Sequence, residues 1–116
     1  MKRQLAEKRG RSGESRAAIW LRAKGWRVID TRVKTPAGEI DLVARRGSLV
    51  AFVEVKWRAK KAELDHAIDH HRLARVAAAA EAIAYRYLAD GDDMRVDVIL
   101  LAPGSLPRHI ENAWQP

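Results

Sequence analysis

The chain has 116 residues, enough for one compact domain and too few for two ordinary ones. Its residues are 47% hydrophobic and 32% charged, which excludes a disordered chain. No apolar run approaches the roughly 20 residues of a membrane span, and the first residues lack the apolar stretch of a signal peptide. The absence of cysteine excludes disulfides, thiolate zinc sites and cysteine nucleophiles. We therefore expect a cytoplasmic protein that does not enter a membrane.

The charge is strongly basic, with a formal net charge of +7 and a pI near 10.2. Eleven of the 22 lysines and arginines precede Thr35, where three acidic residues oppose them. Such a polarised charge favours a polyanionic partner, nucleic acid above all. Charge alone does not separate a nucleic-acid-binding surface from an inert basic one, so the chemistry of particular residues has to decide.

The predicted elements begin after a basic, glycine-containing arm at residues 1–12, and residues 13–116 are expected to form a single domain. Apolar residues recur with the helical period over 13–25, where Gly25 supplies the stop. Residues 26–33 are rich in β-branched side chains and predict a strand.

A second strand is expected at 39–44 and a third, the most strongly β-like segment of the chain, at 49–57. The intervening residues 45–48 predict a hairpin connection. An alanine-rich segment at 65–89 with an apolar stripe predicts a long helix ended by Gly91.

The last expected strand is residues 94–101, which are largely apolar and predict a buried strand. A short tail holding Ile110 and Trp114 follows. The order is therefore helix, three strands, helix, strand and tail. It predicts an α/β fold with a central mixed sheet flanked by helices.

Charged residues interrupt the apolar pattern of the predicted hairpin. Side chains alternate between the two faces of a strand. One face of segment 49–57 carries two apolar residues and then two charged ones: Val50, Phe52, Glu54 and Lys56. In the preceding strand, Glu39, Asp41 and Val43 share a face, and Ile40, Leu42 and Ala44 share the other.

Whether these two charged faces coincide depends on the hairpin register. An even loop centred on Arg46 and Gly47 pairs Asp41 with Phe52 and puts the charged groups of both strands on one face. Asp41 then lies diagonal to Glu54. An odd loop would send them to opposite faces, and the residues alone leave both registers open.

With the even register, carboxylates would crowd together, an arrangement that a divalent cation stabilises. Mg²⁺ prefers oxygen ligands and takes few from the protein, so Asp41, Glu54 and the Val55 backbone carbonyl would suffice; Mn²⁺ shares these ligands. Lys56 would stand beside the metal, able to hold a water or to neutralise charge on a phosphate. An isolated E-x-K is more often a solvent-facing pair, and its meaning here comes from the neighbouring E-I-D.

The motifs resemble a known family. G-E-I-D-L-V at residues 38–43, followed by F-V-E-V-K at 52–56, is similar to the PD-(D/E)xK nuclease superfamily, and within it to the YraN family. The resemblance extends to G-E-S-R-A at 13–17, R-V-D-V-I at 95–99 and H-I-E-N-A-W at 109–114, which together span nearly the whole chain.

This resemblance implies a restriction-endonuclease-like fold, similar to archaeal Holliday junction resolvases. Asp41 and Glu54 match the metal ligands and Lys56 the catalytic lysine. Glu14 matches a helical glutamate that reaches the metal through water, and Glu39 matches the glutamate of G-E-I-D, without a defined role. A homodimer with two active sites would suit a junction substrate.

Two positions depart from the family pattern. Where family members usually carry Asn-x-Arg ahead of G-E-I-D, this chain has Arg32-Val33-Lys34, and Arg72 stands where a lysine is usual in the second helix. Both departures keep positive charge, so phosphate contact is expected to survive. The basic residues expected to contact nucleic acid are Arg11, Arg16, Arg32, Lys34, Arg58, Lys60, Lys61 and Arg72.

Three functions remain open from the sequence. The first is a Mg²⁺-dependent or Mn²⁺-dependent endonuclease acting on DNA, with branched or junction structures as one substrate class. The second is a nucleic-acid-binding module that keeps the fold with little or no turnover. The third is a small adaptor that uses its basic face on a protein or ribonucleoprotein.

Overall fold

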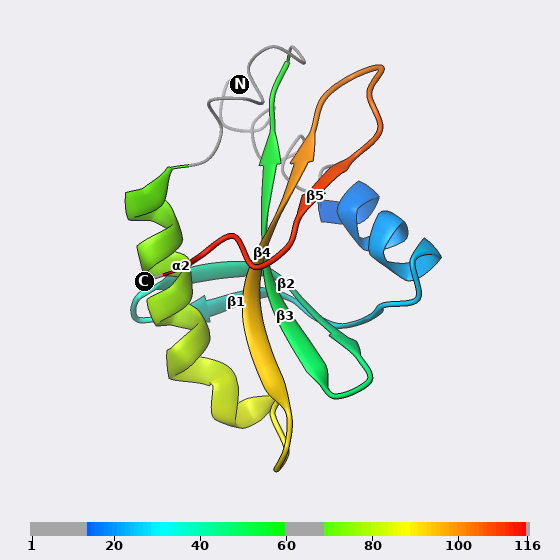
Figure 1. The fold of residues 1–116 in the computed structure, drawn as a ribbon. Coiled ribbons are helices and arrows are strands. Elements are labelled where there is room, and N and C mark those ends of the chain that lie inside the picture. The colour runs from blue at the N-terminus through cyan, green and yellow to red at the C-terminus, as the bar shows by residue number, and fades with distance from the viewer. Residues whose placement is uncertain (1–13, 60–68, 116) are drawn as a thin grey trace.

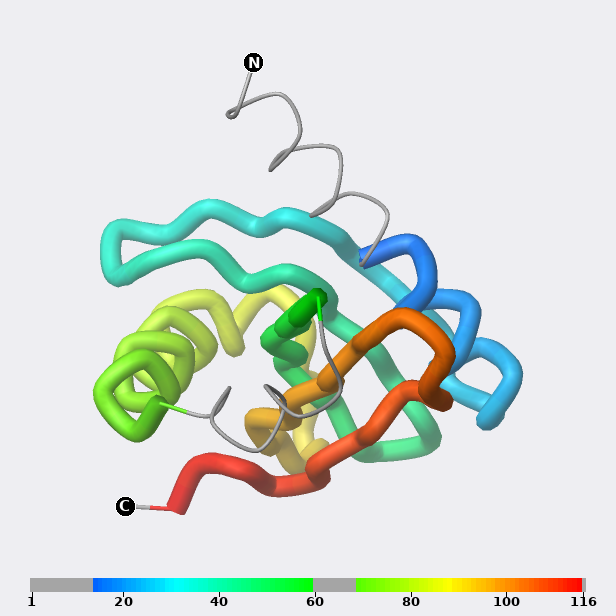
Figure 2. Tube along the Cα trace, turned by 90° about the horizontal axis from the view of Figure 1, so that it is seen from above, coloured from blue at the N-terminus to red at the C-terminus, as the bar shows by residue number. Residues whose placement is uncertain are grey.

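A five-stranded mixed sheet separates two helices in the computed structural model, which describes residues 14–59 and 69–115 (Figure 1). The expected α/β class, with a mixed sheet flanked by helices, is confirmed. The expected basic arm at residues 1–12 lies outside the described residues. Seen from above, the hairpin of the first two strands extends from the side of the N-terminal helix to the side of the second helix (Figure 2).

The N-terminal helix is described over residues 14–23 and ends as predicted at Gly25. Gly25 has a φ of 89°, and the Trp26 N–H donates to the carbonyl of Leu21 at 2.9 Å, closing the last turn. A positive φ at this position is the usual reason for glycine at a helix C-terminus.

The strands are β1 (Arg27–Thr35), β2 (Gly38–Arg46), β3 (Leu49–Trp57), β4 (Asp93–Leu101) and β5 (Arg108–Ile110). They lie in the order β1-β2-β3-β4-β5, and only β3 and β4 are parallel. The parallel pair requires a crossover, which α2 (His70–Ile83) provides. Every strand except β5 was predicted, and the residues of β5 were expected to be part of the tail.

The second helix is shorter than predicted at its C-terminal end. α2 stops at Ile83 and a 3₁₀ turn, η2 (Ala84–Arg86), follows, so the prediction of helix up to residue 89 is wrong. The tighter turn lets Tyr87 pack edge-on against Phe52, 6.0 Å between ring centroids, and donate to Asp30 at 2.7 Å. Tertiary contacts of this one tyrosine therefore override the helix propensity of the segment.

The hairpin loop is even, as the shared charged face requires, but it is centred one residue later than expected. Arg46 pairs with Leu49, so Gly47 and Ser48 form the turn, and Gly47 adopts a φ of 61°. A two-residue hairpin needs such a conformation, which glycine adopts without strain. Val43, rather than Asp41, therefore pairs with Phe52. Continued along the two strands, this register directs Asp41 straight toward Glu54, whereas the predicted register placed the two residues diagonally.

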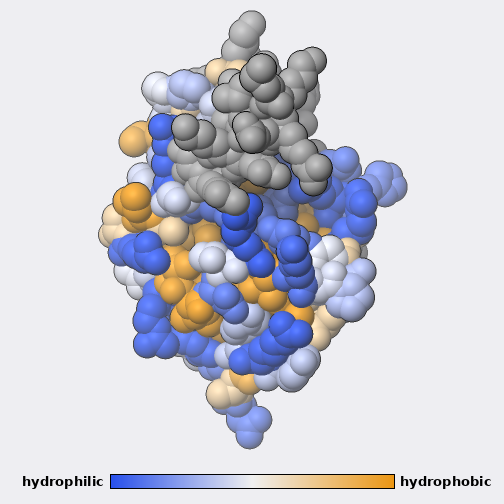
Figure 3. Space-filling model, turned by 180° about the vertical axis from the view of Figure 1, so that it is seen from behind, coloured by the Kyte–Doolittle hydropathy of each residue, from blue (hydrophilic) through white to orange (hydrophobic). Residues whose placement is uncertain are grey.

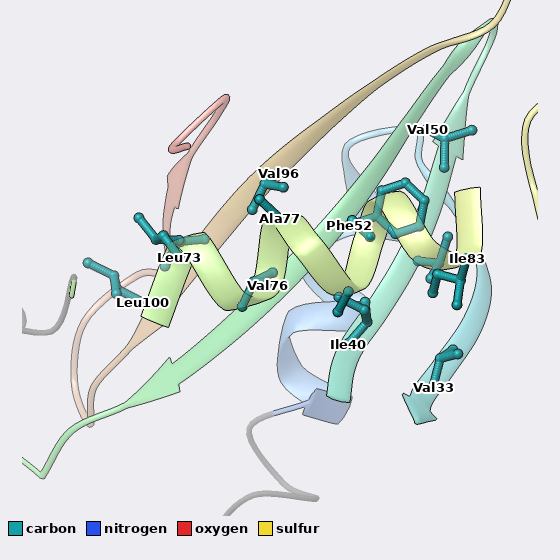
Figure 4. Packing of buried hydrophobic residues seen from close by; sticks show 14 of the residues in the cluster. Val33, Ile40, Val50, Phe52, Leu73, Val76, Ala77, Ile83, Val96 and Leu100 are labelled. Carbon is teal, nitrogen blue, oxygen red and sulfur yellow. The ribbon is translucent and has the colours of Figure 1, made fainter. Parts of the chain in front are cut away.

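Two hydrophobic clusters occupy the two faces of the sheet. α2 packs its buried residues against one face, around Phe52 (Figure 4). The N-terminal helix covers the other face through Ala17, Ala18 and Leu21. Alternation in β3 is confirmed, since Val50 and Phe52 belong to the first cluster and Ala51 and Val53 to the second.

In β2 the alternation breaks. Leu42 and Ala44 belong to the cluster under the N-terminal helix, as expected, but Ile40 belongs to the cluster under α2. Figure 4 shows Ile40 pointing toward α2 beside Val33. The strand is therefore bent between Ile40 and Leu42, at Asp41, and the prediction that all three apolar residues share a face is wrong at Ile40.

The surface mixes charge with small apolar areas. The rear face in Figure 3 carries hydrophilic side chains around an apolar patch near its centre. The large hydrophobic residues most exposed in the described chain are Ile19, Tyr85 and Leu106. Among the described residues, no helix is both long and apolar enough to cross a membrane.

Candidate metal centre and nucleic-acid interface

Asp41 lies where the regular pairing of β2 with β3 ends. Toward β3, the last ladder pair is Leu42 with Val53, and the Asp41 Oδ2 then accepts a hydrogen bond from the Val55 N–H at 2.7 Å. Toward β1, the neighbouring Arg32 has a φ of 53°, in the left-handed region. The bend thus turns the Asp41 carboxylate toward the gap that opens between β2 and β3.

Three carboxylates from two elements, the N-terminal helix and β2, converge at this bend. Oxygen atoms of Glu14, Glu39 and Asp41 all lie within 4.8 Å of one another. Glu14 comes from the N-terminal helix and is held by the guanidinium of Arg32, with 3.2 Å between Nε and Oε2. The left-handed residue of β1 therefore also orients the carboxylate contributed by the helix.

The electrostatics of the cluster are most unfavourable at Asp41. Burial, together with the negative charge of Glu54, Glu14 and Glu39, raises the pKa of its carboxyl to about 7, although the hydrogen bond from Val55 lowers it. Two of these causes, desolvation and like charge, both oppose a second negative charge in a confined site.

Glu54 has the opposite environment. Its side chain is only 3% exposed, and its Oε1 accepts from Arg72 Nε at 2.8 Å while Lys56 Nζ lies 3.2 Å from the same oxygen. Lys56 is on the same strand face two residues later, as alternation predicted. Arg72 comes from the first turn of α2, a contact that no local pattern indicates. This buried carboxylate is therefore fixed by two cations on one oxygen.

A surface hollow of about 140 Å³ opens beside these groups. The hairpin tip at residues 37–38 forms one side, α2 forms the other through Arg72 and Arg75, and Glu39 and Glu54 line it between them. A second hollow, lined by Glu14, Arg22 and Arg32 among others, lies between the N-terminal helix and β1. Arginines therefore stand on both sides of the carboxylates.

The structure brings together the predicted residues Asp41, Glu54 and Lys56, with Glu14 and Glu39 beside Asp41. Val55 is also adjacent, although the contact it makes here is through its N–H to Asp41. Their positions permit the predicted assignment of these residues as metal ligands and catalysts, which stays a prediction.

The predicted nucleic-acid contacts are scattered. Arg11, Lys60 and Lys61 lie outside the described residues. Arg32 and Arg72 border the acidic cluster, and Lys34 is exposed on β1 opposite Glu39.

The remaining two predicted nucleic-acid contacts, Arg58 and Arg16, lie away from the acidic cluster. Arg58 folds back onto the carbonyl of Trp57 at 2.9 Å, and Arg16 lines a separate, largely apolar hollow under the N-terminal helix. Arg22 and Arg75, which line the two hollows beside the carboxylates, were not singled out from the sequence.

A second buried polar cluster was missed because its members are far apart in sequence. Asp97 is fully buried on β4 and accepts from Arg95 at 2.9 Å, from the ring of His109 at 2.8 Å and from the Asn112 N–H at 2.9 Å. Burial alone would raise the pKa of Asp97, but the bonds from His109, Asn112 and Arg95 outweigh it and hold the pKa below its usual range.

These bonds tie β5 and the following tail to β4, so the R-V-D-V-I and H-I-E-N-A-W segments meet in the fold. Tail residue Ala113 adds a backbone bond to the carbonyl of Val96 at 2.7 Å. The cluster lies inside the fold, so we assign it a structural role. The signal that could have found it is an aspartate within the strand, directly before the apolar run 98–101.

Fold and site together define a small α/β protein with an acidic cluster at the bend of a mixed sheet. The chain belongs to the UPF0102 family, since the model of the uncharacterised protein family UPF0102 matches residues 13–101. It is 75% identical to a UPF0102 protein of Erythrobacter litoralis and 60% identical to one of Sphingopyxis alaskensis, in both cases over the full length of each chain. A UPF0102 protein of Rhodopseudomonas palustris strain BisB18 is 46% identical, over 97% of this chain and 84% of the relative.

Family membership bears out the YraN-like part of the resemblance. The names of these relatives state no activity.

Proposed function

We propose that this protein is a metal-dependent nuclease that hydrolyses phosphodiester bonds in DNA, with Mg²⁺ or Mn²⁺ held by Asp41 and Glu54. The observation that carries the proposal is the convergence of carboxylates from the N-terminal helix, β2 and β3 at the point where β2 bends. A fold without a ligand at this point would gain nothing from such crowding, because each carboxylate raises the cost of ionising the next.

The donor set fits a hard divalent cation. Mg²⁺ and Mn²⁺ prefer oxygen ligands, and the oxygens of Glu14, Glu39 and Asp41 lie within 4.8 Å of one another. Glu54 joins them electrostatically, as its effect on the pKa of Asp41 shows. No cysteine or histidine belongs to this group of side chains in the described chain, so a zinc site of the usual nitrogen and sulfur type has no support here.

When bound, the cation supplies Lewis acidity toward water and toward a phosphoryl oxygen. The chain supplies the rest. Lys56, held by Glu54, would donate to the attacking water or offset the negative charge that grows on the phosphate. Arg22, Arg32 and Arg75, on either side of the carboxylates, would attract and orient the nucleic-acid backbone.

Finer features of the proposal rest on the resemblance described above. A restriction-endonuclease-like fold is consistent with the mixed sheet and the two flanking helices. Activity on branched DNA, and a homodimer with two sites, follow from the similarity to archaeal Holliday junction resolvases.

The experiment is a cleavage assay with the purified protein on linear, flapped and four-way DNA and on linear RNA, in Mg²⁺ or Mn²⁺. Wild-type protein is expected to cut at least one DNA substrate, and the variants Asp41→Asn and Lys56→Ala are expected to lose this activity. Asp93→Asn and Lys24→Ala remove the same charges from exposed positions and serve as matched controls.

The alternatives predict other results. No cleavage of any substrate, together with salt-sensitive DNA binding, would leave a nucleic-acid-binding module. Negligible nucleic-acid affinity at physiological salt would leave the adaptor. Cleavage that survives Asp41→Asn would point to a contaminating nuclease and reject the assigned site.

A further inference from the structure

Arg72 links Glu54, the most buried carboxylate of the site, to the solvent-exposed side of the site. The side chain of Glu54 is 3% exposed and that of Arg72 is 54% exposed, yet their Oε1 and Nε atoms lie 2.8 Å apart. The position of Arg72 is fixed at the start of α2, where the N-cap Asp69 accepts from the N–H groups of His71 at 2.9 Å and Arg72 at 3.4 Å. A rigid helix terminus thus presents this guanidinium.

Each partner has hydrogen-bonding groups that no described residue uses. Both cations on Glu54 bind the same oxygen, and the Oε2 atom has no hydrogen bond to the described residues. Likewise, the two Nη groups of Arg72 donate to no group in the described part of the chain. They belong to the side chain that lines the hollow together with Arg75.

We propose that Arg72 is a two-sided positioning residue, in which Nε holds Glu54 with Oε2 turned to the metal while the Nη groups receive a phosphate oxygen of the bound strand. This inference rests on the proposed function. A guanidinium can serve two acceptors at once because its five N–H groups form a planar fork. A lysine ammonium at this position would have to serve one acceptor or the other.

A simpler electrostatic reading makes the opposite prediction. If Arg72 acted only as a positive charge close to the site, it would repel a divalent cation, and its removal would tighten metal binding. If it positions Glu54, its removal weakens metal binding, and outer partners of metal ligands typically change metal affinity by about 10- to 100-fold. The sign of the change therefore separates the two readings.

The test measures Mn²⁺ binding to the metal-free protein by titration calorimetry, without nucleic acid. Arg72→Gln is expected to weaken Mn²⁺ affinity by about 10-fold or more. Arg75→Gln is the matched control, because Arg75 lines the same hollow from the same helix without contacting Glu54. It should leave Mn²⁺ affinity within about twofold of wild type.

A second measurement addresses the other side of the guanidinium. Binding of a short DNA duplex is followed by fluorescence anisotropy in EDTA, where the metal plays no part. Arg72→Gln and Arg75→Gln should both weaken binding and reduce its salt dependence, since each removes a phosphate contact. Arg72→Lys should retain DNA affinity yet bind Mn²⁺ less tightly than wild type, because the charge is kept and the fork is lost.

Unchanged or tighter Mn²⁺ binding by Arg72→Gln, with Mn²⁺ binding by wild type intact, overturns this inference and leaves the proposed function standing. Failure of wild type to bind Mn²⁺ at all removes the proposed function and this inference with it. Circular dichroism verifies that the variants are folded. If Arg72→Gln is unfolded, Mn²⁺ binding by Arg72→Lys decides instead: weaker binding than wild type supports the inference, and unchanged or tighter binding overturns it.

Discussion

Asp41→Asn is expected to make the protein more stable in neutral and alkaline solution while abolishing metal binding. In the folded chain, burial and the neighbouring carboxylates raise the pKa of Asp41 from its ordinary 3.8 to about 7. Between these two values the folded state binds a proton that the unfolded state has lost. The stability of wild type therefore falls as the pH rises through this window.

The magnitude follows from the two pKa values. Because a tenfold change in an equilibrium is about 1.4 kcal/mol, a rise from 3.8 to about 7 corresponds to about 4 kcal/mol lost above the window. Asp41 retains some contact with solvent, which screens the effect, so we expect about 2 kcal/mol. Asparagine cannot ionise, and its oxygen can still accept the Val55 N–H, so the variant escapes this loss.

The assay is urea unfolding followed by tryptophan fluorescence at about pH 4 and about pH 8. Variant and wild type should have similar stability at the lower pH, and the variant should be the more stable at the higher pH. Mg²⁺ at the higher pH should stabilise wild type and leave the variant unchanged. The exposed Asp93→Asn is the matched control. An Asp41→Asn protein that is less stable than wild type at about pH 8 would refute this account of the site.

Three further substitutions test the fold around the site, each by the free energy of unfolding. Asp97→Asn should lower the free energy of unfolding by about 3 kcal/mol, because the buried groups that donate to Asp97 would lose their charged acceptor. Since the pKa of Asp97 is lowered in the folded state, the difference between variant and wild type should vanish only as the pH falls below the usual pKa range of an aspartate. Phe52→Ala should cost about 4 kcal/mol through the cavity it leaves, against almost nothing for Ile19→Ala at a 64% exposed position. Arg32→Asn should stabilise by about 0.5 to 1 kcal/mol at high salt, where the ion pair to Glu14 is screened, because asparagine tolerates a φ of 53° better than arginine. Wild-type or lower stability of Arg32→Asn under these conditions would contradict the strain argument.

The last of these substitutions bears on the departure from the family pattern. The resemblance described above places an asparagine of the family pattern where this chain has Arg32, and Arg32 occupies the left-handed conformation beside Asp41. The guanidinium in turn orients Glu14. This chain therefore combines backbone strain with an ion pair at a position where asparagine would give neither.

Local patterns predicted the elements well where each one depends on its own residues. Alternation in β3 placed Glu54 and Lys56 on one face, and glycine chemistry placed the end of the N-terminal helix. β5 was missed because three residues carry no period of their own and are held by long-range bonds to Asp97. The end of α2 was missed for a similar reason, since Tyr87 acts through distant partners.

For the site, the sequence determined which residues share a face but not how those faces meet. The loop had to be even for Asp41 to approach Glu54, and a turn at Gly47 and Ser48, rather than at Arg46 and Gly47, set the exact register. The contact between Arg72 and Glu54 depends on where α2 lies on the sheet, which no spacing within the helix reports.

The bend in β2 means that Asp41 lies between residues anchored in opposite hydrophobic clusters. Ile40 is held under α2 and Leu42 under the N-terminal helix, and both are fully buried. A change in the packing of either cluster would therefore move one of the two residues that flank Asp41, and with it the Asp41 carboxylate. Mutations that alter metal affinity should consequently arise in both interiors, remote from any charged group, so a selection for tighter or weaker ion binding would recover aliphatic substitutions as well as acidic ones.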